Sequence, residues 1–314
     1  MPLEEIRAAR ARLSGVALRT PLVRLEADPA PGAEVWLKLE NLQPIGSFKI
    51  RGAGNAMGAA PPGTLDRGVY TASAGNMAQG VAWNARRLGI PCTVIVPDHA
   101  PETKLAAIAR LGGRVVKVPF ETWWRVLEEH AYPGIEGVFL HPVSDPLVIA
   151  GNGTIGLEIL EDLPDVDTVL IPFGGGGLSS GIALAVKSAR PEARVFACEV
   201  ETAPPLSASL SAGRPLSIDY RPSFVDGIGG RSVLPEMWPL VRSVLDGSRV
   251  VSLDAIASAI RLLVERHRVV AEGAGAAAVA ALQPSDSGKI VCVISGGNID
   301  AGKLSRILSG GIPD

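Results

Sequence analysis

Four consecutive glycines stand between an apolar run and a helical pattern, a combination suited to binding an anion. Residues 169–173 are apolar and favour a strand, Gly174 to Gly177 follow, and Leu178 begins an amphipathic helical pattern. Because glycine has no Cβ, successive backbone N–H groups can converge on one ligand. The positive end of the following helix dipole favours the same ligand. We interpret the loop as a phosphate site, with a glycine-rich packing turn as the alternative.

Two kinds of ligand could bear that phosphate, and only one of them requires a lysine. The loop lacks the Gly-Lys-Ser/Thr ending of a P-loop and the spacing G-x-G-x-x-G. A dinucleotide remains possible, because the next strand ends near Glu199, an acid that could bind a ribose. Pyridoxal phosphate is the other candidate, and its aldehyde needs an amine.

Lys49 is the lysine best suited to that role. The chain has seven lysines, and most lie on polar helix faces or at strand ends. Lys49 lies between Phe48 and Ile50 at the start of a predicted helix. Burial there would lower its pKa and supply the neutral amine that imine formation requires.

Four motifs in order identify a family. They are SFKIRGA (residues 47–53), SAGN (73–76), GGGGL (174–178) and SGGN (295–298). Together they closely resemble the fold-type-II pyridoxal-phosphate enzymes, specifically threonine/serine dehydratases and serine racemases. The resemblance runs from RTPL (19–22) to the last strand. It implies two interleaved three-layer α/β domains with mostly parallel sheets, similar to the β-subunit of tryptophan synthase. The large domain would hold residues 1–51 and 145–314, and the small domain residues 52–144.

The resemblance also implies roles for single residues. Lys49 would hold the cofactor covalently and later remove the substrate's Cα proton. Asn76 would bind the ring oxygen, unless it only caps a helix, and Ser295 would face the pyridine nitrogen. The implied cofactor contacts are Lys49, Phe48, Asn76, Gly174, Gly175, Gly176, Gly177, Leu178 and Ser295. The implied substrate-carboxylate site is Ser73, Ala74, Gly75, Asn76 and Met77.

Two departures from the family pattern favour elimination over racemisation. Met77 stands where relatives usually carry His. Ala74 stands where serine racemases resemble one another in carrying a second Ser, the base on the opposite face of Cα. A monovalent or divalent cation held by Glu199 and the carbonyl of Ala203 is a weaker implication; a solvated strand-end acid is the alternative reading of Glu199.

The pattern along the chain supports this architecture. Strands are predicted at residues 34–40, 69–71, 92–96, 114–118, 137–140, 169–173, 194–200 and 290–294. Helices are predicted at residues 4–13, 47–57, 77–88, 102–111, 122–130, 147–163, 178 onward, 237–245, 254–267, 273–282 and 303–308. Residues 202–230 are predicted to be irregular. Alternating strands and helices imply parallel sheets covered on both faces.

Composition excludes several other functions. The formal net charge is −2, and no basic stripe with interleaved aromatics supports nucleic-acid binding. No apolar run approaches membrane-spanning length, and the N-terminus does not read as a signal peptide. Three cysteines in apolar runs suggest buried thiols in a reducing cytoplasm.

We therefore expect a cytoplasmic, homo-oligomeric pyridoxal-phosphate-dependent dehydratase. It would convert L-threonine or L-serine into 2-oxobutyrate or pyruvate plus ammonia. A serine racemase or β-replacement enzyme on the same fold is the first alternative. A nicotinamide-dependent dehydrogenase using the glycine loop and Glu199 is an alternative from another class.

Overall fold

The chain forms two compact units, each assembled from separate parts of the sequence. The computed structural model describes residues 1–26 and 30–313. Unit 1 comprises residues 1–18 and 43–152, and unit 2 comprises residues 19–42 and 153–314. This grouping places residues 1–18, 43–51 and 145–152 with the segment expected to form the small domain. The boundaries at residues 52 and 144 stay a prediction.

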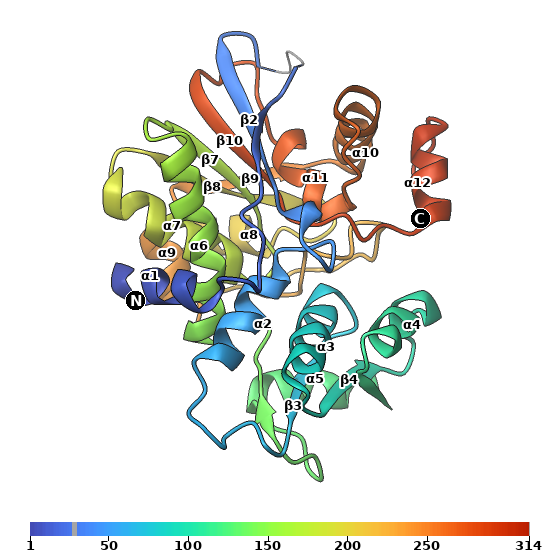
Figure 1. The fold of residues 1–314 in the computed structure, drawn as a ribbon. Coiled ribbons are helices and arrows are strands. Elements are labelled where there is room, and N and C mark those ends of the chain that lie inside the picture. The colour runs from blue at the N-terminus through green and yellow to red at the C-terminus, as the bar shows by residue number, and fades with distance from the viewer. Residues whose placement is uncertain (27–29, 314) are drawn as a thin grey trace. The chain divides into compact units, whose positions relative to one another are not determined.

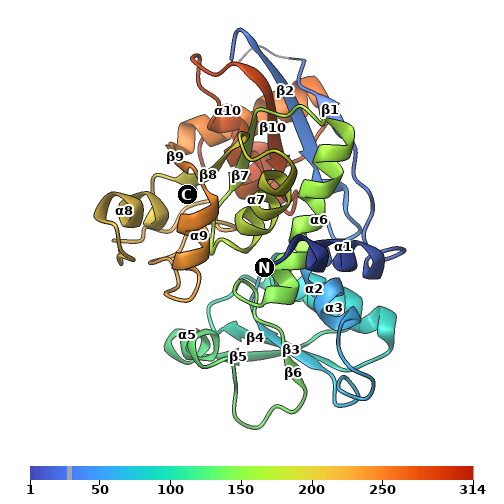
Figure 2. The same ribbon diagram turned by 90° about the vertical axis from the view of Figure 1, so that its left-hand side faces the viewer.

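Unit 1 is built around a parallel four-stranded sheet in the order β5-β4-β3-β6 (Figures 1 and 2). Its elements are α1 (Leu3–Arg12), α2 (Lys49–Gly58), β3 (Val69–Ala72), α3 (Asn76–Leu88), β4 (Cys92–Pro97), α4 (Glu102–Arg110), β5 (Arg114–Val118), α5 (Phe120–Glu129) and β6 (Val138–Phe139). Alternate residues of β3 point to opposite faces, as the pleat requires. Val69 packs with α2, α3 and α4, whereas Tyr70 and Ala72 pack with Val126 of α5.

Unit 2 is built around a six-stranded sheet in the order β1-β2-β10-β7-β8-β9, in which only β1 runs antiparallel to its neighbour. Its strands are β1 (Leu22–Arg24), β2 (Ala33–Leu39), β7 (Thr168–Pro172), β8 (Arg194–Val200), β9 (Gly247–Val251) and β10 (Gly288–Ile294). Its helices are η1 (Glu40–Leu42), α7 (Gly177–Ala189), α8 (Pro205–Ala212), α9 (Trp238–Val244), α10 (Leu253–Leu262), η2 (Leu263–His267), α11 (Gly273–Ala280) and α12 (Ala301–Leu308). The helix α6 (Pro146–Asp162) begins in unit 1 and ends in unit 2.

Helices cover both faces of the unit 2 sheet. Figure 1 shows α7 and α9 on one side of it and α10 and α11 on the other. Every residue of β7 is buried, and β10 is buried from Ile290 to Ile294. This explains why β7 and β10 read as continuous apolar runs in the sequence.

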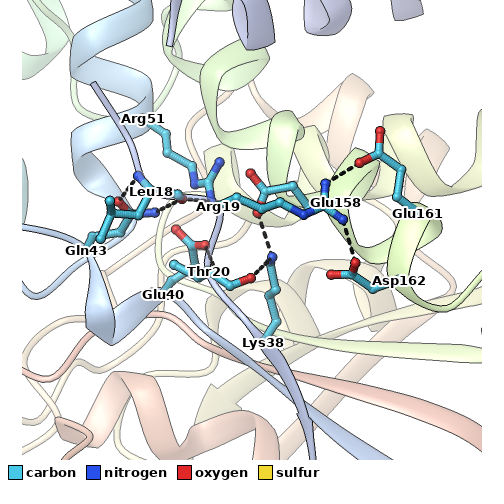
Figure 3. A network of polar contacts seen from close by, with 10 residues as sticks. All are labelled: Leu18, Arg19, Thr20, Lys38, Glu40, Gln43, Arg51, Glu158, Glu161 and Asp162. Atoms are coloured by element: carbon cyan, nitrogen blue, oxygen red, sulfur yellow. Dashed lines mark hydrogen bonds and ion pairs between the residues drawn. The ribbon is translucent and has the colours of Figure 1, made fainter. Parts of the chain in front are cut away.

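A chain of buried polar groups fixes the edge strand pair of unit 2 to α6 (Figure 3). The Nζ of Lys38, a fully buried residue, donates to Glu158 Oε2 at 2.6 Å and to the carbonyl of Thr20 at 2.6 Å. The hydroxyl of Thr20 donates to Glu40 Oε1 at 2.6 Å. Because a buried charge without a partner is costly, these contacts account for the fully buried position of Lys38.

The expected architecture is confirmed, namely two α/β units with mostly parallel sheets. All predicted strands and helices are present. The bounds of β5 and β8 are as predicted, and the other elements, with α10 and η2 taken as one helix, have ends shifted by one or two residues. Four elements were not predicted: the edge strands β1 and β9, the short helix η1, and α8, which lies inside the stretch expected to be irregular. Within the described ranges, no helix is both long enough and apolar enough to cross a membrane.

Candidate active site

Lys49 is held at the start of α2 by close packing against α3. A Cβ added at Gly80 of α3 would lie 2.9 Å from the carbonyl oxygen of Lys49, so the two helices approach at backbone distance. Next to this contact, Asn84 Nδ2 donates to the carbonyl of Ile50 at 3.3 Å. The backbone that carries the lysine is therefore fixed by α3.

The amine of Lys49 is desolvated and held by one carbonyl. Its Nζ donates to the carbonyl oxygen of Pro142 at 2.8 Å. Desolvation lowers the pKa of this amine from its ordinary value of 10.5 to about 8. The Nζ also lies 5.2 Å from the centre of the Phe48 ring. A lowered pKa leaves a larger neutral fraction near neutral pH, which nucleophilic attack on a carbonyl requires.

The predicted carboxylate site lies where β3 ends and α3 begins. Gly75 is the N-cap residue and its N–H donates to Ser73 Oγ at 3.2 Å. Asn76 is the first helical residue, so the alternative that it is the cap does not hold. The first N–H groups of α3 have no partner within the helix and suit an anion. Met77 is 1% exposed and packs in the apolar core, so its side chain points away from any ligand at this edge.

The strand next to β3 brings a second loop to the same edge of the sheet. β3 and β6 are parallel, with Val69 opposite Val138 and Tyr70 opposite Phe139. Residues 141–144 follow β6, and they include the Pro142 carbonyl that holds Lys49. Sequence reasoning missed this loop. Its signal was a histidine directly after a predicted strand of a parallel sheet.

In unit 2, the glycine loop leads from β7 into α7 as expected. Gly176 is the N-cap residue, with φ +97°, and α7 begins at Gly177, one residue before the predicted start. A Cβ at Gly176 would also lie 2.8 Å from Val241 Cγ2. Gly174 and Gly175 are half-buried, so backbone at this turn remains accessible. The Oγ of Ser180, in the first turns of α7, is buried without a hydrogen-bond partner.

Ser295 lies at the same edge of the unit 2 sheet. β10 pairs with β7, with Cys292 opposite Leu170. Extending this parallel register places the ends of the two strands side by side, so the glycine loop and Ser295 follow neighbouring strand ends. Glycines allow close approach here, since a Cβ at Gly275 would lie 2.2 Å from the carbonyl oxygen of Gly296.

Glu199 is buried near the end of β8, and its carboxylate caps α8. Its Oε1 accepts from the N–H of Leu206 at 2.7 Å. Its Oε2 accepts from the N–H of Ser207 at 2.8 Å and from Ser248 Oγ at 2.6 Å. Desolvation raises the pKa of Glu199, and these three hydrogen bonds oppose the rise. The alternative of a solvated strand-end acid is therefore wrong. The cation site with Ala203 stays a prediction.

The residues fall into two groups, and the chemistry of each fits one part of pyridoxal phosphate. Unit 1 brings together Lys49, Phe48 and the 73–77 segment. In unit 2, the glycine loop, Ser295 and Glu199 lie at or near the ends of the neighbouring strands β7, β10 and β8. A desolvated amine suits an aldehyde, and a helix N-terminus with accessible glycine backbone suits a phosphate.

Comparisons with known proteins agree with this chemistry. The family model "Pyridoxal-phosphate dependent enzyme" matches residues 13–296. The L-threonine ammonia-lyase of Thermotoga maritima is 43% identical over 320 residues, covering 99% of this chain and 79% of that protein. The catabolic L-threonine dehydratase of Escherichia coli strain K12 is 39% identical over 314 residues, covering 97% and 95%. The structure of maize serine racemase matches with a TM-score of 0.88 and 34% identity, covering 98% of this chain and 97% of that one. The chain belongs to the pyridoxal-phosphate dependent enzymes, with a fold of type II.

Proposed function

We propose that this protein is a pyridoxal-phosphate-dependent dehydratase of L-threonine and L-serine. It would release 2-oxobutyrate from threonine, or pyruvate from serine, together with one ammonia. The observation that carries the proposal is the amine of Lys49, which donates to the Pro142 carbonyl at 2.8 Å and whose pKa is lowered to about 8 by desolvation. The names of the Thermotoga and Escherichia coli relatives support the choice of substrate and reaction.

Lys49 would attach the cofactor and then act as the base. When bound, pyridoxal phosphate withdraws electrons from the substrate's Cα. As a free amine, Lys49 could accept the Cα proton, because its lowered pKa increases the neutral fraction near neutral pH. The Pro142 carbonyl gives the free amine one defined position.

The remaining residues would bind rather than transfer protons. The N–H groups at the start of α7, with Gly174, Gly175, Gly176, Gly177 and Leu178, would hold the phosphate. The N–H groups of Ser73 to Met77 would hold the substrate carboxylate, and Asn76 the ring oxygen. Ser295, a weaker proton donor than a carboxylic acid, would leave the pyridine nitrogen neutral, which favours prompt loss of a β-hydroxyl.

Three further assignments are part of the proposal. Residues 52–144 would form the small domain and residues 1–51 and 145–314 the large one. Cys92, Cys198 and Cys292 are buried and unpaired, which supports a reducing, cytoplasmic location. The resemblance supports a homo-oligomer, which light scattering of the purified protein would test.

Serine racemase chemistry is the second candidate, because maize serine racemase shares the fold. Ala74 speaks against it, since this position carries no hydroxyl to act on the opposite face of Cα. Incubation with L-serine and chiral analysis separates the two. Accumulation of D-serine without pyruvate would overturn the dehydratase assignment.

The decisive experiment maps the amine that carries the cofactor. Borohydride reduction of the loaded protein, followed by peptide mass analysis, should place the adduct on Lys49. Lys49→Ala should abolish threonine turnover while the protein still folds, since only the nucleophile and base are lost. Lys117→Ala is the matched control, because this exposed lysine pairs only with Glu102 at 2.7 Å among the contacts described. An adduct on another lysine, or turnover by Lys49→Ala, would refute the proposal.

A further inference from the structure

The carbonyl that accepts from the Lys49 amine belongs to residue 142 of the turn 141–144, which is organised around the buried ring of His141. The ring of His141 is 2% exposed, and its Nδ1 accepts from the N–H of Val143 at 3.2 Å and from the N–H of Ser144 at 2.8 Å. The hydroxyl of Ser144 also lies 2.9 Å from Nδ1. Pro142, whose carbonyl accepts from Lys49 Nζ, lies in the chain between His141 and these donor residues.

The chemistry of these contacts fixes the protonation state of the ring. Backbone N–H groups can only donate, so Nδ1 must carry a lone pair and the proton of neutral His141 sits on Nε2. The Ser144 hydroxyl therefore donates as well. The pKa of His141 is lowered to about 4, chiefly by desolvation and also by the nearby charges of His130 and Lys49, while a backbone hydrogen bond with Leu127 opposes the shift. The ring of His130 stacks on it with centroids 4.5 Å apart.

We propose that His141 is a positioning residue for Lys49. Its unprotonated Nδ1 gathers three donors, closes the turn 141–144, and so aims the Pro142 carbonyl at the lysine amine. The effect reaches Lys49 through the backbone, because the imidazole itself makes no hydrogen bond to Nζ among the contacts described. The importance of His141 for turnover rests on the proposed function. The hydrogen bond between Lys49 and the Pro142 carbonyl, in contrast, is present without cofactor.

The test measures the reactivity of Lys49 in the cofactor-free protein. Trace acetylation with acetic anhydride at pH 8, read by peptide mass analysis, gives the labelling rate of Lys49 relative to Lys117 in the same sample. His141→Ala removes the acceptor and should raise the rate about fivefold, the factor that corresponds to one net hydrogen bond. His141→Asn should restore the wild-type rate, because an Asn side-chain oxygen accepts from backbone N–H groups in the same kind of turn.

A second variant and a second readout keep the result interpretable if His141→Ala does not fold. Ser144→Ala removes one donor only and should raise the labelling rate by a smaller factor. Hydrogen exchange of the Val143 and Ser144 amides should quicken in His141→Ala and not in His141→Asn. Unchanged Lys49 labelling in folded His141→Ala, or in Ser144→Ala if His141→Ala is unfolded, would overturn the proposal. Borohydride mapping of wild-type protein tests the proposed function separately.

Discussion

A lysine amine attacks a carbonyl only after it has lost its proton, and the surroundings of Lys49 favour that loss. Desolvation lowers its pKa to about 8, and no carboxylate is among the causes of the shift. A carboxylate partner would have acted in the opposite direction by stabilising the charged form. Lys38 shows the contrast, since it is fully buried and its amine is paired with Glu158. The two lysines therefore differ in that Lys38 has an acidic partner, whereas no carboxylate contributes to the pKa shift of Lys49.

At Ala74 we predict that a single hydroxyl changes the ratio of products. Ala74 is half-buried and lies between β3 and α3, within the proposed carboxylate site. Ala74→Ser should raise D-serine formation relative to pyruvate, because it supplies a second acid or base group for Cα. The measurement is chiral chromatography together with a pyruvate assay. Ala74→Val is the matched control, since it adds bulk without a proton donor, and an equal ratio in both variants would contradict the prediction.

At the scale of elements, Gly80 sets the distance between α2 and α3. Its missing Cβ leaves room for the carbonyl of Lys49, where an added methyl would lie 2.9 Å from the oxygen. Gly80→Ala should therefore destabilise the protein by about 1–3 kcal/mol, as overpacking does. It should also weaken cofactor attachment, because it displaces the backbone of Lys49. Thermal unfolding and cofactor titration measure the two effects.

Gly58→Ala provides the comparison for Gly80→Ala within α2. Its added Cβ would meet Arg12 at an ordinary 3.6 Å. Because alanine is the better helix former, this change should stabilise the protein by up to about 1 kcal/mol. Equal melting temperatures for the two variants would contradict the packing argument.

The strands and the helix α8 that sequence reasoning missed were hidden for different physical reasons. β1 and β9 are the two edge strands of their sheet, so they lack the two-sided burial that makes β7 and β10 continuous apolar runs. α8 is rich in Ser and begins at a proline, and its start is stabilised by Glu199, seven residues before Leu206. No residue at the start of α8 indicates in the sequence that Glu199 caps this helix. The glycine loop and Lys49 were predictable because their chemistry is visible in single residue types, whereas the Pro142 contact depends on how β6 pairs with β3.

At the scale of the whole molecule, His141 should make the cofactor-free protein sensitive to acid. The pKa of His141 is about 4 in the folded protein, compared with the ordinary value of 6.5 expected in the unfolded chain. Between these two pH values the unfolded chain therefore binds more protons than the folded protein. Stability should therefore fall as the pH drops from about 6.5 toward 4, by about 3 kcal/mol from this group. Urea unfolding of wild type and His141→Asn across this range isolates the contribution, since the other titrating groups are common to both. If the free energies of unfolding of the two proteins changed in parallel with pH, the predicted contribution of His141 would be contradicted.

The order in which the strands are synthesised differs from the order in which they pair. β10, the last strand of the chain, lies between β2 and β7 in the sheet of unit 2. During translation, every strand of unit 1 emerges before β7, and β2 and β7 then lack their common partner until β10 emerges. Nascent chains and fragments that end before Gly288 would thus present two open strand edges, which pair readily with other chains. A stop codon close to the C-terminus would then produce an aggregating polypeptide rather than a slightly shortened enzyme.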